Sequence, residues 1–167
     1  MKKSKHPSPK ILETTKECLE LSGFLNHVVN DMVFLEHEKA HYWATYHASK
    51  LKSELKVYHE NIKNLPDFEE YEVTRKKMLK DGTFNLKNLE DQFPEFIKKK
   101  NSLQDEPLKF EIRPFLTDWA FEIGASRDIS GILIEFDLLD DPEKLLDYIY
   151  SSDTVKKDEK KDKKSKK

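Results

Sequence analysis

Residues 24–65 read FLNHVVNDMVFLEHEKAHYWATYHASKLKSELKVYHENIKNL. This stretch holds no proline and no glycine, and it lies between Gly23 and Pro66. Glycine and proline are the residues that most often mark helix ends, so residues 24–65 predict one long central helix. At about 1.5 Å per residue it would be roughly 60 Å long, and the other segments would have to pack along it.

Apolar residues form two patterns along this predicted helix. In the C-terminal half they alternate at spacings of four and three, which is typical of a narrow seam that faces another helix. The seam residues are Ala44, Ala48, Leu51, Leu55, Tyr58, Ile62 and Leu65. The N-terminal half has a wider apolar stripe and an aromatic cluster, which either packs in the core or forms a partner surface. The predicted partner-binding residues are Tyr42, Trp43, Tyr46, Leu51, Leu55 and Tyr58.

Composition favours a mainly helical chain. Of the 167 residues, 37% are apolar and 37% are charged, and only four are glycine. A sandwich or barrel of many short strands needs frequent turn residues, which four glycines do not supply. We therefore predict a mainly α fold, with the long helix in a helical bundle or hairpin and a small C-terminal α+β portion.

The chain before residue 105 divides into a flexible arm over residues 1–9 and a helical region over residues 10–104. A first helix is predicted from Ile11, with a corner at Gly23, where the glycine either ends the helix or is tolerated inside it. A third helix follows Pro66. The Asp81-Gly82 pair either ends that helix or forms a hairpin turn. Asn85 is a predicted N-cap, and Pro94 opens the next short helix.

The C-terminal portion over residues 105–150 carries the best strand signal. Leu108, Phe110 and Ile112 alternate with charged residues, which is the period of a strand with one buried face. Residues 132–136 fit either a partner strand or a helix capped by Asp128, and we favour the helix. Asp141-Pro142-Glu143 is a helix start. Residues 151–167 are predicted to be a disordered, Lys-rich tail that belongs to no core.

Charge is placed unevenly along the chain. The formal net charge is −2. Residues 1–10 carry four lysines and no acid, and residues 151–167 carry eight lysines against four acids, so the body between them is strongly acidic. An acidic body disfavours nucleic-acid binding, because phosphate contacts require clustered cations, although the two ends could touch phosphates weakly.

The single cysteine, Cys18, excludes an intrachain disulfide and fits a reducing compartment. We expect it to be a buried core thiol rather than a nucleophile. No stretch approaches a membrane span, and the first residues lack the apolar segment of a signal peptide. These features predict a cytoplasmic protein with no membrane partner.

One motif inside the predicted helix carries chemistry. His37-Glu38-Lys39-Ala40-His41 has the form H-E-x-x-H, in which two histidines one helical turn apart bind zinc and the glutamate activates water. With His47 the stretch resembles the metzincin signature, but Ala44 stands where that family has the glycine that breaks the helix. If the helix continues through Ala44, His47 lies about 15 Å along the axis from His37 and cannot share its ion. Two interpretations compete with a catalytic site: a non-catalytic metal site at His37 and His41, and histidines that merely pack or face solvent and need no cofactor.

Three segments resemble an uncharacterised family of small proteins encoded by phages of low-GC bacteria. They lie at residues 39–55, 108–115 and 129–133. The resemblance implies a small viral accessory protein in the host cytoplasm, such as an inhibitor of a host protein or an assembly factor. We predict a non-enzymatic protein that binds another protein or a second copy of itself. The alternative is a zinc-dependent hydrolase with His37 and His41 as ligands and Glu38 as the catalytic base.

Overall fold

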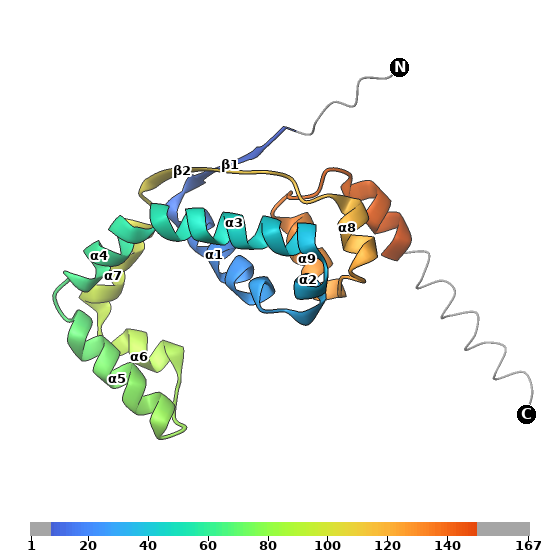
Figure 1. Ribbon diagram of the computed structural model, residues 1–167. Coiled ribbons are helices and arrows are strands. Elements are labelled where there is room, and N and C mark those ends of the chain that lie inside the picture. Colours follow the sequence, from blue (N-terminus) through green and yellow to red (C-terminus); the bar gives the residue numbers. More distant parts are fainter. Residues whose placement is uncertain (1–7, 150–167) are drawn as a thin grey trace, which may run out of the picture. The chain divides into compact units, whose positions relative to one another are not determined.

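The computed structural model describes residues 8–149 (Figure 1). The fold is mainly α, as predicted, with one small two-stranded antiparallel sheet among the described residues. The chain forms two compact units, and each is built from segments distant in sequence. Within the described residues, unit 1 contains residues 8–10, 24–47 and 111–149, and unit 2 contains residues 11–23 and 48–110.

The predicted single helix over residues 24–65 is wrong. Four helices cover this region and the residues before it: α1 (Thr15–Val29), α2 (Met32–Glu36), α3 (Glu38–Glu54) and α4 (Lys56–Lys63). The helix is interrupted although the sequence has no proline or glycine there, because polar side chains cap the ends of the new helices. Asp31 accepts a hydrogen bond from the Val33 amide at the start of α2, and His37 has an extended backbone between α2 and α3. The break at Leu55 is a local kink, since Leu55 N still donates to Leu51 O.

The predicted first helix begins later than expected. Residues Lys10–Thr14 form strand β1, which pairs with strand β2 (Pro107–Ile112). The strand predicted over residues 108–112 is thus confirmed, but its partner is β1 rather than residues 132–136. Gly23 lies inside α1, so the expected corner is absent there. Residues 1–7 of the predicted arm lie outside the described residues.

Unit 2 contains a small helical core beneath α5 (Phe68–Lys80), α6 (Leu86–Gln92) and α7 (Pro94–Gln104). Figure 1 shows these three helices. Tyr71, Leu89 and Phe96 bury their side chains together, and each comes from a different one of them. Two predicted helix starts are confirmed: Asn85 caps α6 by accepting from the Asn88 amide, and Pro94 is in the first turn of α7. Gly82 adopts a φ of 68° after α5, so the Asp81-Gly82 pair ends a helix and forms no hairpin.

Cys18 is fully buried in unit 2, as predicted. Its thiol donates a hydrogen bond to the Leu108 carbonyl, with the sulfur 3.8 Å from the oxygen. Burial, with smaller contributions from the charges of Glu17 and Glu54, raises the pKa of the Cys18 thiol to about 11. The thiol is therefore protonated and unreactive in the folded protein at neutral pH.

Unit 1 packs around Phe115. Its ring contacts Phe34 of α2, Trp43 of α3 and Trp119 of α8 (Thr117–Glu122), with centroids 5.0 to 5.8 Å apart. Its backbone N–H donates to Leu138 O, and its carbonyl accepts from the Asp140 amide. The segment between Ile112 and α8 is thereby held on two sides, which positions the residues just before Phe115.

The last helices of unit 1 settle one open alternative. Residues 132–136 belong mostly to helix α9 (Arg127–Glu135) and not to a strand. Its cap is Ser126, whose side chain accepts from the Ile129 amide, rather than Asp128. A further helix covers residues 142–149, as the Asp141-Pro142-Glu143 sequence predicted. The predicted tail over residues 151–167 lies outside the described residues. No helix within residues 8–149 is long and apolar enough to cross a membrane.

Candidate functional site

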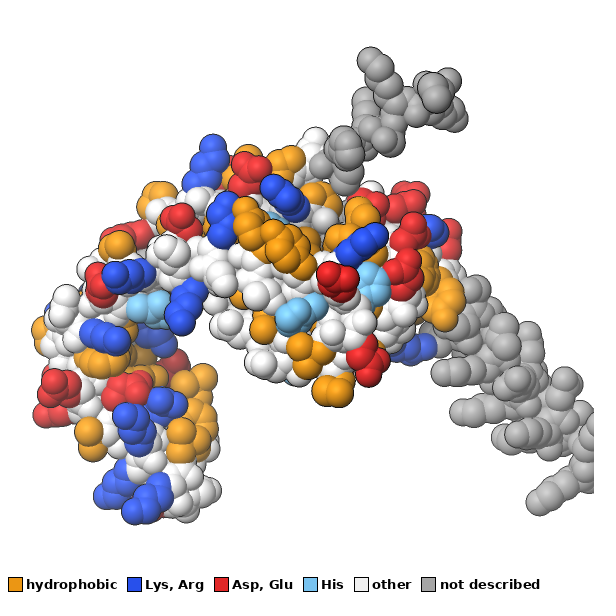
Figure 2. Space-filling model, viewed as in Figure 1, with side chains coloured by type: hydrophobic (Ala, Val, Ile, Leu, Met, Phe, Trp, Pro, Cys, Tyr) orange, Lys and Arg blue, Asp and Glu red, His pale blue; other side chains and the backbone are white. Residues whose placement is uncertain are grey.

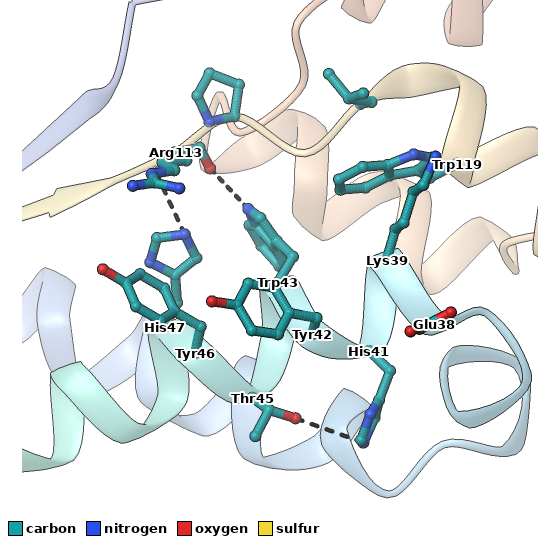
Figure 3. Close-up of a pocket in the computed structure, with 12 residues that line it drawn as sticks. Glu38, Lys39, His41, Tyr42, Trp43, Thr45, Tyr46, His47, Arg113 and Trp119 are labelled. Carbon is teal, nitrogen blue, oxygen red and sulfur yellow. Dashed lines mark hydrogen bonds between the residues drawn. The ribbon is translucent and has the colours of Figure 1, made fainter.

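An open groove of about 720 Å³ lies in unit 1, beside the N-terminal half of α3 (Figure 3). Two segments line it, one from α3 and one that runs from the end of β2 into α8. The lining residues are Glu38, Lys39, His41, Tyr42, Trp43, Thr45, Tyr46, His47, Arg113, Pro114, Leu116 and Trp119. Aromatic rings and cationic side chains dominate this list, so the groove suits a ligand with both apolar and polar groups.

Two side chains of α3 hold the backbone of Arg113 at the edge of the groove. The indole N–H of Trp43 donates to the Arg113 carbonyl with a nitrogen–oxygen distance of 2.8 Å. The Arg113 amide donates to Nε2 of His47 at 3.4 Å. Trp43 and His47 are four residues apart, so they lie one above the other on the same face of α3 and can reach both polar groups of one residue. Both side chains are almost fully buried.

An aromatic platform extends from this anchored residue. The rings of Tyr42 and Tyr46 stack with centroids 5.9 Å apart and an interplanar angle of 20°. The Arg113 guanidinium lies over the Tyr46 ring, 5.6 Å from its centroid, in a cation–π contact. Tyr42 is 65% exposed, while Tyr46 is half-buried. A large, mostly exposed ring held against another ring is an apolar surface ready for contact.

Trp119 and Leu116 add a second apolar element to the groove, and both are half-buried. Trp119 packs edge-on against Phe115, and its ring centroid lies 6.1 Å from that of His37. Only the five residues 114–118 separate Trp119 from Arg113 in the sequence. The groove is therefore lined by rings that the core of unit 1 holds in place.

Charge is distributed unevenly within the body. The described part of unit 1 has thirteen acidic side chains against five basic ones, a formal charge of −8, whereas unit 2 has a formal charge of −1. Figure 2 shows many of these acids gathered over the C-terminal helices of unit 1, with hydrophobic side chains over α3. Two of the five cations, Lys39 and Arg113, line the groove, together with the single acid Glu38. The groove is thus locally cationic in an acidic unit.

The H-E-x-x-H residues do not form the arrangement that a zincin requires. His37 precedes α3 with φ −107° and ψ 97°, so it is not on the helical face that carries His41. Its Nδ1 accepts from the Ala40 amide at 3.1 Å, which caps α3, and its Nε2 pairs with Glu122. His41 instead points to the side of α3 where Thr45 lies, away from Arg113 (Figure 3).

His47, the third histidine of the metzincin-like stretch, has a structural role. Because α3 continues through Ala44, His47 is far along the helix from His37, and it binds the Arg113 amide. Among residues 8–149, no group of three or more His, Cys, Asp or Glu side chains is placed to hold a metal ion. Glu38, the catalytic base of the zinc alternative, is exposed at the rim of the groove.

The structure divides the predicted partner-binding residues between two places. Tyr42, Trp43 and Tyr46 come together at the groove, although Trp43 is buried beneath it rather than exposed. Leu51 and Leu55 belong to unit 2 and are buried in the core of the chain itself. Tyr58 is half-buried and its hydroxyl accepts a hydrogen bond from Gln104. The seam from Leu51 onward is therefore covered by this chain's own residues.

Two groove residues escaped the reasoning from sequence. Trp119 and Arg113 are not among the site residues predicted from the sequence. The usable signal was the position of Arg113 at the end of a clear strand, directly before Pro114, where the chain must leave the sheet.

No family model, no curated protein and no solved structure matches this chain.

Proposed function

We propose that this protein acts by binding another protein in the groove of unit 1, without catalysing a reaction. The observation that carries the proposal is the exposed ring of Tyr42, which stacks on Tyr46, the ring that the guanidinium of Arg113 contacts. Tyrosine, tryptophan and arginine are the residues most enriched at the energetic centres of protein interfaces. All three residue types line this groove.

The rigidity of the groove supports binding over chemistry. Trp43 and His47 are buried and bound to the Arg113 backbone, so the surface is ordered before a partner arrives, and less entropy is lost on association. Two of the described groove residues are histidines: His47 is buried and bound to the Arg113 amide, and His41 lies 3.4 Å from the Thr45 hydroxyl. No nucleophile–base–orienter arrangement occurs among the described groove residues.

The resemblance to phage-encoded proteins of low-GC bacteria is consistent with such a role. A small accessory protein that inhibits a host protein or assists an assembly needs one recognition surface and no active site. The groove occupant would then be a host or virion protein. A dimer through Leu51 and Leu55 would require opening the core of unit 2, so we place recognition at the groove instead.

The proposal is tested by site-specific photo-crosslinking in the cells that naturally make the protein. A benzophenone amino acid replaces Tyr42 in one variant and Tyr148, a 59% exposed tyrosine of unit 1 outside the groove, in the other. We expect a discrete crosslinked partner protein at position 42 and none of it at position 148. Equal labelling from both positions, or no protein crosslink from position 42, would refute the proposal.

A further inference from the structure

We propose that the groove takes a short segment of its partner in which acidic residues stand beside aromatic or aliphatic ones. The carboxylates would bind at Arg113 and Lys39, and the apolar side chain would lie on the Tyr42–Tyr46 platform. This inference rests on the proposed function and specifies the chemistry of the partner.

The cations of the groove are available for such a ligand. Lys39 and Arg113 are both exposed, and neither forms an ion pair with a carboxylate anywhere in residues 8–149. The other described cations of unit 1 for which an ion pair is seen, Lys10 and Lys144, bind Asp137 and Asp118. A guanidinium in a cation–π contact with Tyr46 still has N–H groups at its edge, where a carboxylate can accept two hydrogen bonds at once.

A further donor stands on the opposite side of the groove. Trp119 is half-buried, and within the described part of the chain its indole N–H donates to no acceptor. Tryptophan usually finds a hydrogen-bond partner for this group when it is covered. A ligand that covers Trp119 would therefore need an acceptor there, such as a carboxylate or a backbone carbonyl of an extended segment.

The negative charge of unit 1 disfavours some classes of ligand in the groove. Unit 1 as described has a formal charge of −8, which repels a long polyanion such as a nucleic-acid strand. One or two carboxylates at hydrogen-bond distance from Arg113 and Lys39 are held locally, while repulsion from acids more than about 8 Å away is screened at physiological salt. The chain's own Lys-rich ends have the same sign of charge as these two side chains, which disfavours them as occupants.

The size of the groove limits the ligand to a short segment. Its volume of about 720 Å³ lies within the range of about 300–1,000 Å³ that is usual for ligand-binding clefts. A few residues in extended form fill such a space, whereas the flat face of a folded domain would leave it empty. The expected partner element is a loop or tail that carries alternating acidic and apolar side chains.

The experiment is a peptide-display selection on purified full-length protein, with random heptapeptides as the probe. The groove variant combines Lys39→Glu with Arg113→Glu. The matched control combines Lys87→Glu with Lys109→Glu, which reverses two exposed lysines of unit 2 and changes the net charge equally. Thermal unfolding of each variant establishes that the fold is kept.

We expect the wild type and the control to enrich peptides in which Asp or Glu neighbours Phe, Tyr, Trp or Leu. The groove variant should bind those peptides at least tenfold more weakly and should enrich Lys- and Arg-containing ones instead. Enrichment of peptides without acids, or equal binding by the groove variant, would overturn the acidic chemistry while leaving protein binding intact. If no peptide binds above background, or if a single-stranded oligonucleotide binds and peptides do not, both proposals fail.

Discussion

Replacing Tyr42 by alanine should weaken partner binding strongly while barely changing stability. Tyr42 is 65% exposed. An aromatic side chain has roughly 200 Å² to bury, so about 130 Å² remains for a ligand to cover. At about 25 cal/mol per Å² this area contributes roughly 3 kcal/mol, from which about 1 kcal/mol is lost to ordering side chains in the complex. The remaining loss of about 2 kcal/mol corresponds to a roughly 30-fold weaker Kd.

The free energy of unfolding should change by less than about 0.5 kcal/mol, because Tyr42 is on the surface and its described ring contact is the stack on Tyr46. The assay is fluorescence anisotropy of a labelled peptide selected on the wild-type groove, beside urea unfolding. Tyr148→Ala is the matched control: Tyr148 is 59% exposed and packs against Phe121, but it lies outside the groove. A Kd within threefold of wild type for Tyr42→Ala, or an equal loss in the control, would refute the reasoning.

Three further predictions concern the scaffold. Gly23→Ala should stabilise the protein by about 1 kcal/mol in urea unfolding, because Gly23 is inside α1 and an added Cβ meets nothing within 4 Å. Gly124→Ala should destabilise it by a similar amount, because Gly124 has a φ of 60° that L side chains rarely adopt. His37→Ala should lower the free energy of unfolding by about 1–2 kcal/mol because it removes the cap of α3, and Glu122→Ala should lower it by less than about 1 kcal/mol. If elemental analysis instead finds one bound zinc per chain that His37→Ala loses, the hydrolase alternative is supported. Because the pKa of Cys18 is raised, the unfolded thiol ionises near pH 9 while the folded thiol stays neutral, so the free energy of unfolding falls as pH rises from about 9 to 11. Cys18→Ala should lack this part of the fall, about 2 kcal/mol, and identical pH profiles of stability for the variant and the wild type would contradict the raised pKa.

Local signals predicted much of the fold. Asn85, Pro94 and the Asp141-Pro142 pair each mark a helix start through chemistry that involves only a few neighbouring residues, and the structure has helices there. The alternation in β2 was equally clear, because a strand with one buried face has a period of two. Such features depend on the backbone within one turn, which the sequence displays directly.

The errors arose where distant residues determine the structure, or where a local capping signal was overlooked. Lys10–Thr14 is a strand because β2 pairs with it, although its apolar residues also fit a helix. The long stretch over residues 24–65 breaks at Asp31 and His37, whose side chains supply hydrogen bonds in place of proline or glycine. The Asn30-Asp31 pair was a readable signal, since both residue types favour caps over helix interiors.

The candidate site was predictable only on its helical side. Tyr42, Trp43 and Tyr46 form a visible aromatic cluster in the sequence. Arg113 comes from a segment about seventy residues away, and it reaches the cluster because Trp43 and His47 bind its backbone. No spacing rule connects residues that meet through such a tertiary contact, so one half of the groove could not be derived without coordinates.

The contact that holds Arg113 has a consequence for evolution and engineering. Trp43 and His47 bind the carbonyl and the amide of this residue, which are both backbone groups. Every amino acid except proline supplies the same two groups. The side chain at position 113 can therefore change while both backbone bonds are kept, with loss of the contact to the Tyr46 ring, so one substitution there would alter the ligand preference of the groove.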